Sequence, residues 1–131
     1  MFKITPIQTK EEQKEIADVC LATYKEDCFA YSMRDCDTGE IMGFSQFEIR
    51  EGYGYIADLK PRANYTDDEA MFILGRATMN FIDLCGVHIC KADKNGADSK
   101  LLHAIGFREN NSELTVDMTD MFSGKCSGNN T

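Results

Sequence analysis

The sequence of 131 residues contains no tryptophan, only two prolines and only two histidines. Basic residues are also scarce: 14 lysines and arginines stand against 22 aspartates and glutamates, a net charge of −8. Because no basic cluster compensates this charge, we expect no nucleic-acid partner and no binding to anionic membranes. No apolar run approaches the roughly 20 residues that span a bilayer. The first residues lack the basic-then-apolar plan of a signal peptide, so we expect a cytoplasmic protein.

The six cysteines lack the spacing of a metal or redox site. No two of them form a C-x-x-C pair, and they stand singly, mostly within apolar stretches. With no secretion signal, this pattern predicts reduced thiols that are unpaired and mostly buried. The histidines His88 and His103, with Cys85 and Cys90 nearby, match no known zinc-ligand spacing, so we expect no metal site.

The centre of the chain predicts a strand, a long helix and a second strand. An apolar run at 55–59 leads through a polar loop into a stretch with helical periodicity at 66–85, and 87–90 is apolar again. The polar side chains of the helix fall on one narrow stripe, which predicts that most of its circumference is buried. Gly86 suits the left-handed position after a helix end. Two strands joined in this way should be parallel, with a right-handed connection.

The flanking segments predict the rest of one α/β (α+β) domain over residues 1–122, with residues 123–131 as a disordered tail. A capping box formed by Thr9 and Glu12 predicts a helix whose apolar positions continue to Tyr24, with Lys25 in its last turn. The predicted sheet is mixed and mostly antiparallel, with helices on both faces. The further predicted elements are strands at 2–8, 28–34, 41–50 and 113–118 and a helix at 98–105.

This order of elements, with Leu101-Leu102-x-x-Ile105-Gly106-Phe107 near its end, resembles the GNAT family of N-acetyltransferases from Phe2 to about Met118. In that family, the long helix opens with a Gln/Arg-x-x-Gly-x-Gly/Ala loop whose amides bind the pyrophosphate of coenzyme A. The resemblance implies the GNAT fold and acetyl-coenzyme A as the cofactor.

The cofactor loop can be aligned through Ile73-Leu74 and Gly86 of the long helix. Tyr65 then stands at the Gln/Arg position, Asp68 at the first glycine and Ala70 at the last position, where alanine is allowed. One of three motif positions is therefore kept. Asn95 matches the asparagine that the family often has before its last helix. Leu102 replaces a tyrosine that often acts as the general acid.

The resemblance also implies roles for the 55–59 strand and its neighbour. The pantetheine arm of the cofactor would pair with the backbone near Leu59 and Lys60, and Lys60 and Arg62 would offset negative charge near the phosphates. Asp58 or Glu48 would take the amine proton, although each is also compatible with an ordinary ion-paired strand residue. The implied function is acetyl transfer to an amine of a small molecule or peptide, and a homodimer stays open.

An alternative comes from the first turn of the long helix. Thr66 and Glu69 form a second capping box, which predicts Thr66 as the N-cap and places Asp67, Asp68 and Glu69 in the first turn. At ~5 Å and an effective dielectric constant of 20, each carboxylate would oppose a phosphate charge by about 3 kcal/mol. The alternative is a catalytically degenerate GNAT-fold binding module that does not use acetyl-coenzyme A.

Overall fold

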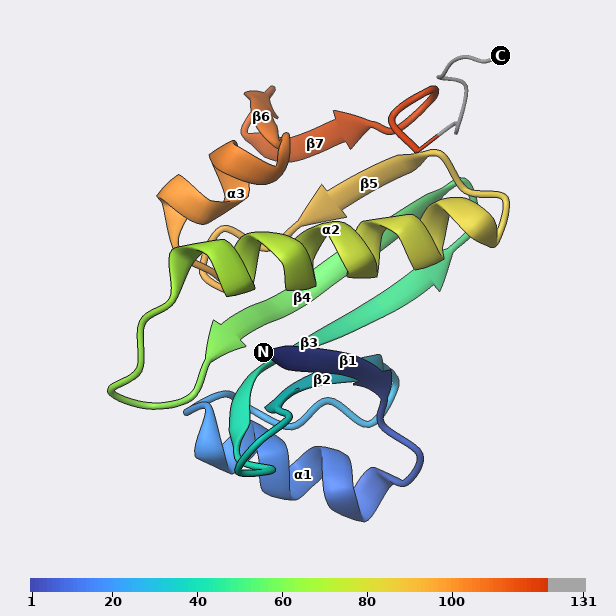
Figure 1. Ribbon diagram of the computed structural model, residues 1–131. Helices are drawn as coiled ribbons and strands as arrows, with labels where there is room; N and C mark the ends of the chain where they lie inside the picture. Colours follow the sequence, from blue (N-terminus) through green and yellow to red (C-terminus); the bar gives the residue numbers. More distant parts are fainter. Residues whose placement is uncertain (123–131) are drawn as a thin grey trace, which may run out of the picture.

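The computed structural model describes residues 1–122 and contains one seven-stranded sheet and three helices (Figure 1). The strands lie in the order β1-β2-β3-β4-β5-β7-β6. None of the helices formed by the described residues is long and apolar enough to span a bilayer. The elements are β1 (Phe2–Pro6), α1 (Lys10–Val19), β2 (Phe29–Asp35), β3 (Ile41–Arg50), β4 (Tyr53–Pro61), α2 (Asp68–Leu84), β5 (Ile89–Ala92), α3 (Ser99–Ile105), β6 (Arg108–Asn110) and β7 (Glu113–Asp117).

The predicted mixed sheet and its single parallel pair are confirmed. Strands β1 to β4 form an antiparallel meander, and β4 pairs in parallel with β5 through α2. In the β3–β4 ladder, Gln46 pairs with Asp58 and Phe47 with Ile56, so Ala57 is an extra residue and β4 bulges there. The last β4–β5 pair is Ile56 with Ala92. Beyond it, β4 continues to Pro61 along an edge that β5 does not cover.

Helices cover both faces of the sheet, as predicted. The residues of β3 alternate: the Ser45 hydroxyl lies 2.8 Å from the Thr78 hydroxyl of α2, whereas Phe44 packs on the opposite side against Ile16 and Ala17 of α1. Figure 1 shows α3 beside the N-terminal half of α2, on the same side of the sheet. The main core therefore lies under α2 and α3, and a smaller one lies under α1.

Helix α1 begins as predicted but ends early. The Thr9 hydroxyl accepts a hydrogen bond from the Glu12 amide at 3.1 Å, which confirms the cap. The prediction that the helix continues to Lys25 is wrong, because Leu21 takes a left-handed conformation at φ 55° just after the helix. Residues 20–28 form a loop instead, and this loop carries Lys25 to the middle of the sheet.

Helix α2 begins one residue later than its predicted cap implies. Its N-cap is Asp67, whose carboxylate accepts a hydrogen bond from the Ala70 amide at 3.0 Å, so Thr66 is not the cap. The helix is also less enclosed than predicted. Ile73 is 39% and Leu84 75% exposed, because no other element of residues 1–122 covers the outer side of α2. Gly86, at φ 93°, follows the helix end as expected.

The structure adds one short strand to the predicted sheet and also tests the prediction made for the cysteines. Strand β6 is not among the predicted elements, and it pairs with β7 through Arg108 and Thr115. The cysteines of the described residues are all unpaired, as predicted. Three of them are buried and two, Cys36 and Cys85, are exposed. Cys126 and the predicted tail lie outside the described residues.

Candidate functional site

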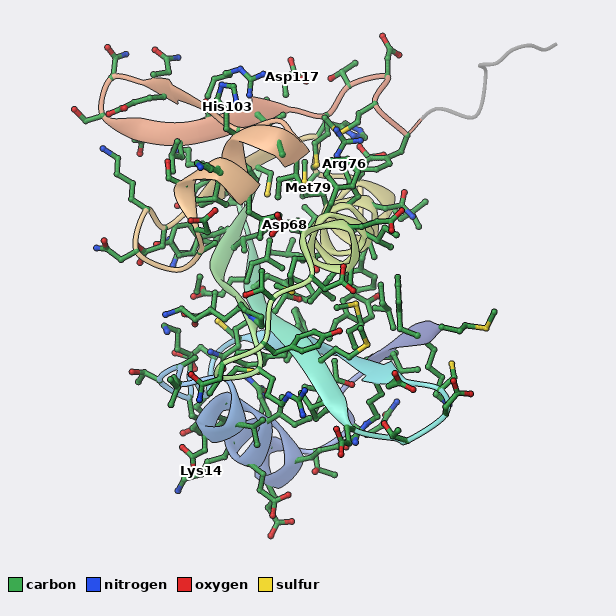
Figure 2. The ribbon with its side chains drawn as sticks, turned by 60° about the vertical axis from the view of Figure 1, so that its left-hand side comes forward. Lys14, Asp68, Arg76, Met79, His103 and Asp117 are labelled. Carbon is green, nitrogen blue, oxygen red and sulfur yellow. The ribbon has the colours of Figure 1, made fainter. Side chains whose placement is uncertain are left out.

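A groove of about 430 Å³ lies at the carboxyl end of β4, between the first turns of α2 and α3. This is the end of a parallel pair at which open α/β sheets bind ligands. Asp68, labelled in Figure 2, lies at the start of α2 on its rim. The lining residues are Leu59, Pro61, Thr66, Asp67, Asp68, Met71, Asp98, Lys100 and Leu101.

Carboxylates outnumber cations in this groove. Asp67, Asp68 and Asp98 line it, with Lys100 as the one lysine among its described lining residues. Asp67 and Asp98 also act as helix caps, accepting bonds from the Ala70 and Leu101 amides. The Ala70 amide, predicted to face the cofactor, is therefore already bonded within the chain. A phosphate entering here would meet negative charge and fewer unbonded amides than a bare helix N-terminus offers.

The predicted residues Arg62 and Tyr65 lie together in the β4–α2 loop. The Arg62 guanidinium lies over the Tyr65 ring, 5.0 Å from its centre, and donates to the Glu40 carboxylate at 3.1 Å. Lys60 pairs in register with Phe44 of β3. These contacts hold the loop against β3, and they direct the Arg62 charge toward Glu40.

Asn95 lies in a second, polar groove of about 370 Å³, whose lining also includes Tyr55, Lys91 and Asp93. The backbone amide of Asn95 donates a hydrogen bond to the Asp93 carboxylate at 2.8 Å. Burial, followed by the negative charge of that carboxylate and its hydrogen bond with the Tyr55 hydroxyl, raises the pKa of Tyr55. The backbone amide of Leu59, on the β4 edge, donates a hydrogen bond to the Gly96 carbonyl at 2.8 Å. The predicted cofactor residues are therefore divided between two grooves and a loop.

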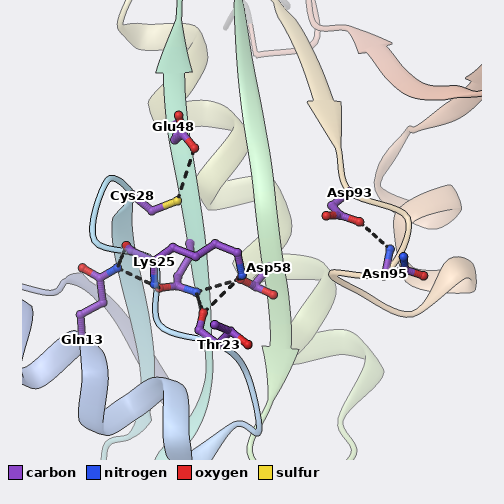
Figure 3. A network of polar contacts seen from close by, with 9 residues as sticks. Gln13, Thr23, Lys25, Cys28, Glu48, Asp58, Asp93 and Asn95 are labelled. Carbon is purple, nitrogen blue, oxygen red and sulfur yellow. Dashed lines mark hydrogen bonds and ion pairs between the residues drawn. The ribbon is translucent and has the colours of Figure 1, made fainter.

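Asp58 belongs to a buried polar network under α1 (Figure 3). Its carboxylate is 2.6 Å from the Lys25 ammonium and accepts a second bond from the Gln46 amide at 2.8 Å. Gln46 in turn accepts bonds from Gln13 at 2.9 Å and from the Lys25 backbone amide at 3.0 Å. With only 4% of its surface exposed, Asp58 is satisfied as a carboxylate inside the fold.

Glu48 lies on the same side of the sheet but is less enclosed (Figure 3). The side chain is 27% exposed and forms an ion pair with Arg50 at 3.1 Å. The Cys28 thiol donates to Glu48 at 3.9 Å. Burial, with the nearby negative charge of Glu48, raises the pKa of Cys28 to about 11, so this thiol is neutral at physiological pH.

Solved structures share this arrangement of elements. A protein from Desulfovibrio desulfuricans assigned to the GNAT family of acetyltransferases superposes with a TM-score of 0.71 at 9% identity, over 90% of this chain and 99% of that one. This chain has the GNAT fold. The ribosomal-protein-S18-alanine N-acetyltransferase of Escherichia coli gives a TM-score of 0.68 at 13% identity, over 90% and 94%. The Thermoplasma acidophilum PaiA N-acetyltransferase, in complex with coenzyme A, gives 0.66 at 12%, over 89% and 99%.

No protein-family model matches the sequence, and a search of curated proteins finds no match. At such low identity, the likeness to GNAT structures establishes the fold alone. The roles of individual residues have to be argued from the side chains of this chain.

Three members of the Asp58 network were not predicted from the sequence. Gln13 and Gln46 were not singled out, and Lys25 was expected in the last turn of the first helix and not beside Asp58. A signal for Gln13 was present, because it stands three residues before Ile16 and so lies on the buried side of α1. Gln46 interrupts the apolar residues of β3 at a position that is fully buried. Two buried amides on adjoining elements indicate a partner between them. The position of Lys25 had no such signal, since it depends on where α1 ends.

Proposed function

We propose that this chain is an N-acyltransferase that transfers an acetyl group from acetyl-coenzyme A to an amine of a small molecule or peptide. The observation that carries the proposal is the groove of about 430 Å³ at the carboxyl end of β4 within a GNAT fold. The T. acidophilum structure of this fold is a complex with coenzyme A. A bulge in β4 and the part of its edge that β5 does not cover lie next to the groove and would provide space and backbone groups for an extended cofactor arm.

In this proposal, the donor phosphates lie at the first turn of α2. The amides of Asp68 and Glu69 and the positive end of the helix dipole would face them. Lys100 lines the groove and supplies a positive charge from α3. Met71 and Leu101 provide apolar walls for the pantetheine arm.

For the acceptor side, we assign the proton-accepting role to Glu48. An attacking amine has to lose a proton, and a carboxylate within reach can take it directly or through water. The Glu48 side chain is 27% exposed, whereas that of Asp58 is 6% exposed and in contact with Lys25. Asp58 is therefore a positioning residue, which holds the loop at 20–28 against the sheet through Lys25.

A second candidate function is a GNAT-fold binding module that does not use acetyl-coenzyme A. The acidic rim of the groove favours it, because Asp67, Asp68 and Asp98 oppose a phosphate and Asp67 occupies the Ala70 amide. At ~5 Å and an effective dielectric constant of 20, each carboxylate would oppose a phosphate charge by about 3 kcal/mol before solvent screening. That exceeds the roughly 0.5–1.5 kcal/mol of an ordinary hydrogen bond.

Calorimetric titration with acetyl-coenzyme A, followed by an assay for release of the free coenzyme A thiol with a panel of amines, separates the two functions. A ligand at 100 times its dissociation constant should stabilise the fold by about 2.7 kcal/mol, which a thermal-shift measurement detects. The acyltransferase proposal predicts binding that weakens in Lys100→Glu, and turnover that falls in Glu48→Gln while binding persists. Absence of binding at millimolar acetyl-coenzyme A would leave the binding module as the function.

A further inference from the structure

Beyond the parallel pair, the edge of β4 that β5 does not cover presents the Leu59 amide. The Arg62 amide donates to the Met42 carbonyl at 2.9 Å, so Arg62 and, by alternation, Lys60 direct their backbone groups to β3. Leu59 and Pro61 therefore face the opposite edge. Proline has no N–H. The Leu59 amide is the donor with which an extended ligand on this edge would have to pair.

That amide is already taken by the segment that follows β5. The Asp93 amide donates to the Ile56 carbonyl at 3.0 Å, and the Gly96 amide donates to the Asp93 carbonyl at 3.0 Å. This turn brings the Gly96 carbonyl to the Leu59 amide at 2.8 Å. The segment Asp93–Asp98, which we term the strap, thus occupies the edge of β4.

Gly96 is pressed closely onto β4. A Cβ added at this residue would overlap the carbonyl oxygen of Ala57 and lie 2.8 Å from its carbonyl carbon. Both atoms belong to backbone, so neither a rotamer change nor a flexible side chain could relieve the overlap. A side chain at position 96 should lift the strap from β4.

The strap also separates the two grooves. Asp93 and Asn95 line the polar groove beside Tyr55, while Asp98 lines the groove beside Leu59. Gly96 lies between these residues in the chain and is buried against β4. Two substrates that bind in the two grooves could react only if this segment moved.

We propose that the Asp93–Asp98 strap is a gate that closes the passage between the two grooves and has to release the Leu59 amide before an extended ligand can bind along β4. The gating of acyl transfer rests on the function proposed above, whereas the opening itself is a property of the fold. A pantetheine arm would replace the Gly96 carbonyl as the partner of Leu59. The strap would then have to open in each catalytic cycle.

Amide hydrogen exchange followed by NMR tests the gate without any ligand. In the natural chain, the Leu59 amide should exchange at least tenfold faster than the Arg62 amide, because opening the strap releases the first and leaves the second bonded to Met42. Equal exchange of the two amides would overturn the proposal. This measurement remains decisive even if the variants below fail to fold.

The variant Gly96→Ala should raise the exchange rate of Leu59 a further tenfold or more and leave that of Arg62 unchanged. Ser99→Ala, an exposed position at the start of α3, is the matched control and should change neither rate. If Leu59 stays as protected in Gly96→Ala as in the natural chain, the strap does not act as a gate.

Titration with coenzyme A then separates the gate from the proposed function. If both hold, Gly96→Ala should bind coenzyme A at least threefold more tightly than the natural chain, since the closed state no longer competes. Coenzyme A binding with the Leu59–Gly96 bond intact would contradict the gate. If the exchange rates change as predicted and neither protein binds coenzyme A, the gate stands and the proposed function is wrong.

Discussion

The Lys25 ammonium lies 2.6 Å from the Asp58 carboxylate and so joins the loop at 20–28 to the central strand β4. Among residues 1–122, Asp58 is the only buried carboxylate. Asp58 is 4% exposed and has the amide of Gln46 as its other donor. Lys25 keeps about a third of its side chain in solvent, so its desolvation is modest. This pair fixes the loop at 20–28 over the face of the sheet where Glu48 and Cys28 lie.

Lys25→Met should destabilise the fold by about 1–3 kcal/mol, because it leaves a buried carboxylate without its cation. Urea denaturation at pH 7 measures the change. Lys14→Met, on the exposed side of α1, is the matched control and should cost less than about 0.5 kcal/mol. Adding Asp58→Asn to Lys25→Met should recover part of the loss. If Lys25→Met is as stable as the natural chain, the loop is held by other contacts.

The N-cap of α2 distinguishes the structure from the sequence-based expectation. Asp67→Ala should cost about 0.5–2 kcal/mol, because the Ala70 amide loses its partner and the helix loses a favourable charge. Thr66→Ala, the matched control, should cost less than about 0.5 kcal/mol. Chemical denaturation of the two variants decides, and the opposite ranking would restore Thr66 as the cap.

The fold was predictable where local signals agree with the packing. The Thr9 capping box, the hairpin turn from Asp35 to Gly39 and the parallel pair around α2 all follow from residue type and periodicity. The end of α1 was not, because the apolar spacing continues through Thr23 and Tyr24, while a tertiary contact of Lys25 with Asp58 holds those residues in a loop. The N-cap of α2 was not predictable either, because the capping box favours Thr66, whereas the neighbouring Asp67, a residue type equally suited to the position, makes the cap in the structure.

The site was harder to predict than the fold. Asp58 and Glu48 were both recognised as candidate bases, but only the structure shows that Asp58 is enclosed by Lys25 and Gln46. Asn95 was placed by its match to the family pattern, whereas the neighbouring Gly96 makes the contact with Leu59. Burial and partners arise from residues distant in sequence, so a linear pattern identifies candidate side chains better than it identifies their roles.

Burial of three thiols should make the fold sensitive to alkaline pH. Burial raises the pKa of Cys20 and Cys90 to about 12 and that of Cys28 to about 11, from 9.0. Above pH 9 the unfolded chain loses these protons first, so the free energy of unfolding should fall by up to about 1.4 kcal/mol per pH unit for each thiol. Below pH 9 their contribution is constant. Denaturation between pH 8 and 10.5 measures the slope, and Cys90→Ala should reduce it.

The same burial predicts which thiols react. At pH 8, the exposed Cys36 and Cys85 should be modified by a thiol reagent within minutes. Cys20, Cys28 and Cys90 should react only after unfolding, because they are buried and neutral. Mass spectrometry of peptides from a Cys126→Ser background identifies the modified residues. Rapid modification of Cys28 in the folded chain would show that the loop at 20–28 opens readily.

The acidic first turn of α2 should limit the affinity for coenzyme A. In Asp67→Ser with Asp68→Asn, the serine keeps an N-cap while two negative charges leave the groove. We expect coenzyme A to bind roughly tenfold more tightly at low salt, since both removed charges oppose the phosphates. The gain should shrink as the ionic strength rises, because these side chains lie at the protein surface.

A matched control removes the same charge elsewhere. Glu15→Gln with Asp18→Asn neutralises two exposed carboxylates of α1 that are not among the described lining residues of the groove, and should change the affinity by less than twofold. Calorimetry at 20 and 300 mM salt compares the two double variants with the natural chain. Suppose that the natural chain already binds coenzyme A in the micromolar range and that Asp67→Ser with Asp68→Asn binds no better. The carboxylates of the α2 first turn would then not be a barrier to coenzyme A binding.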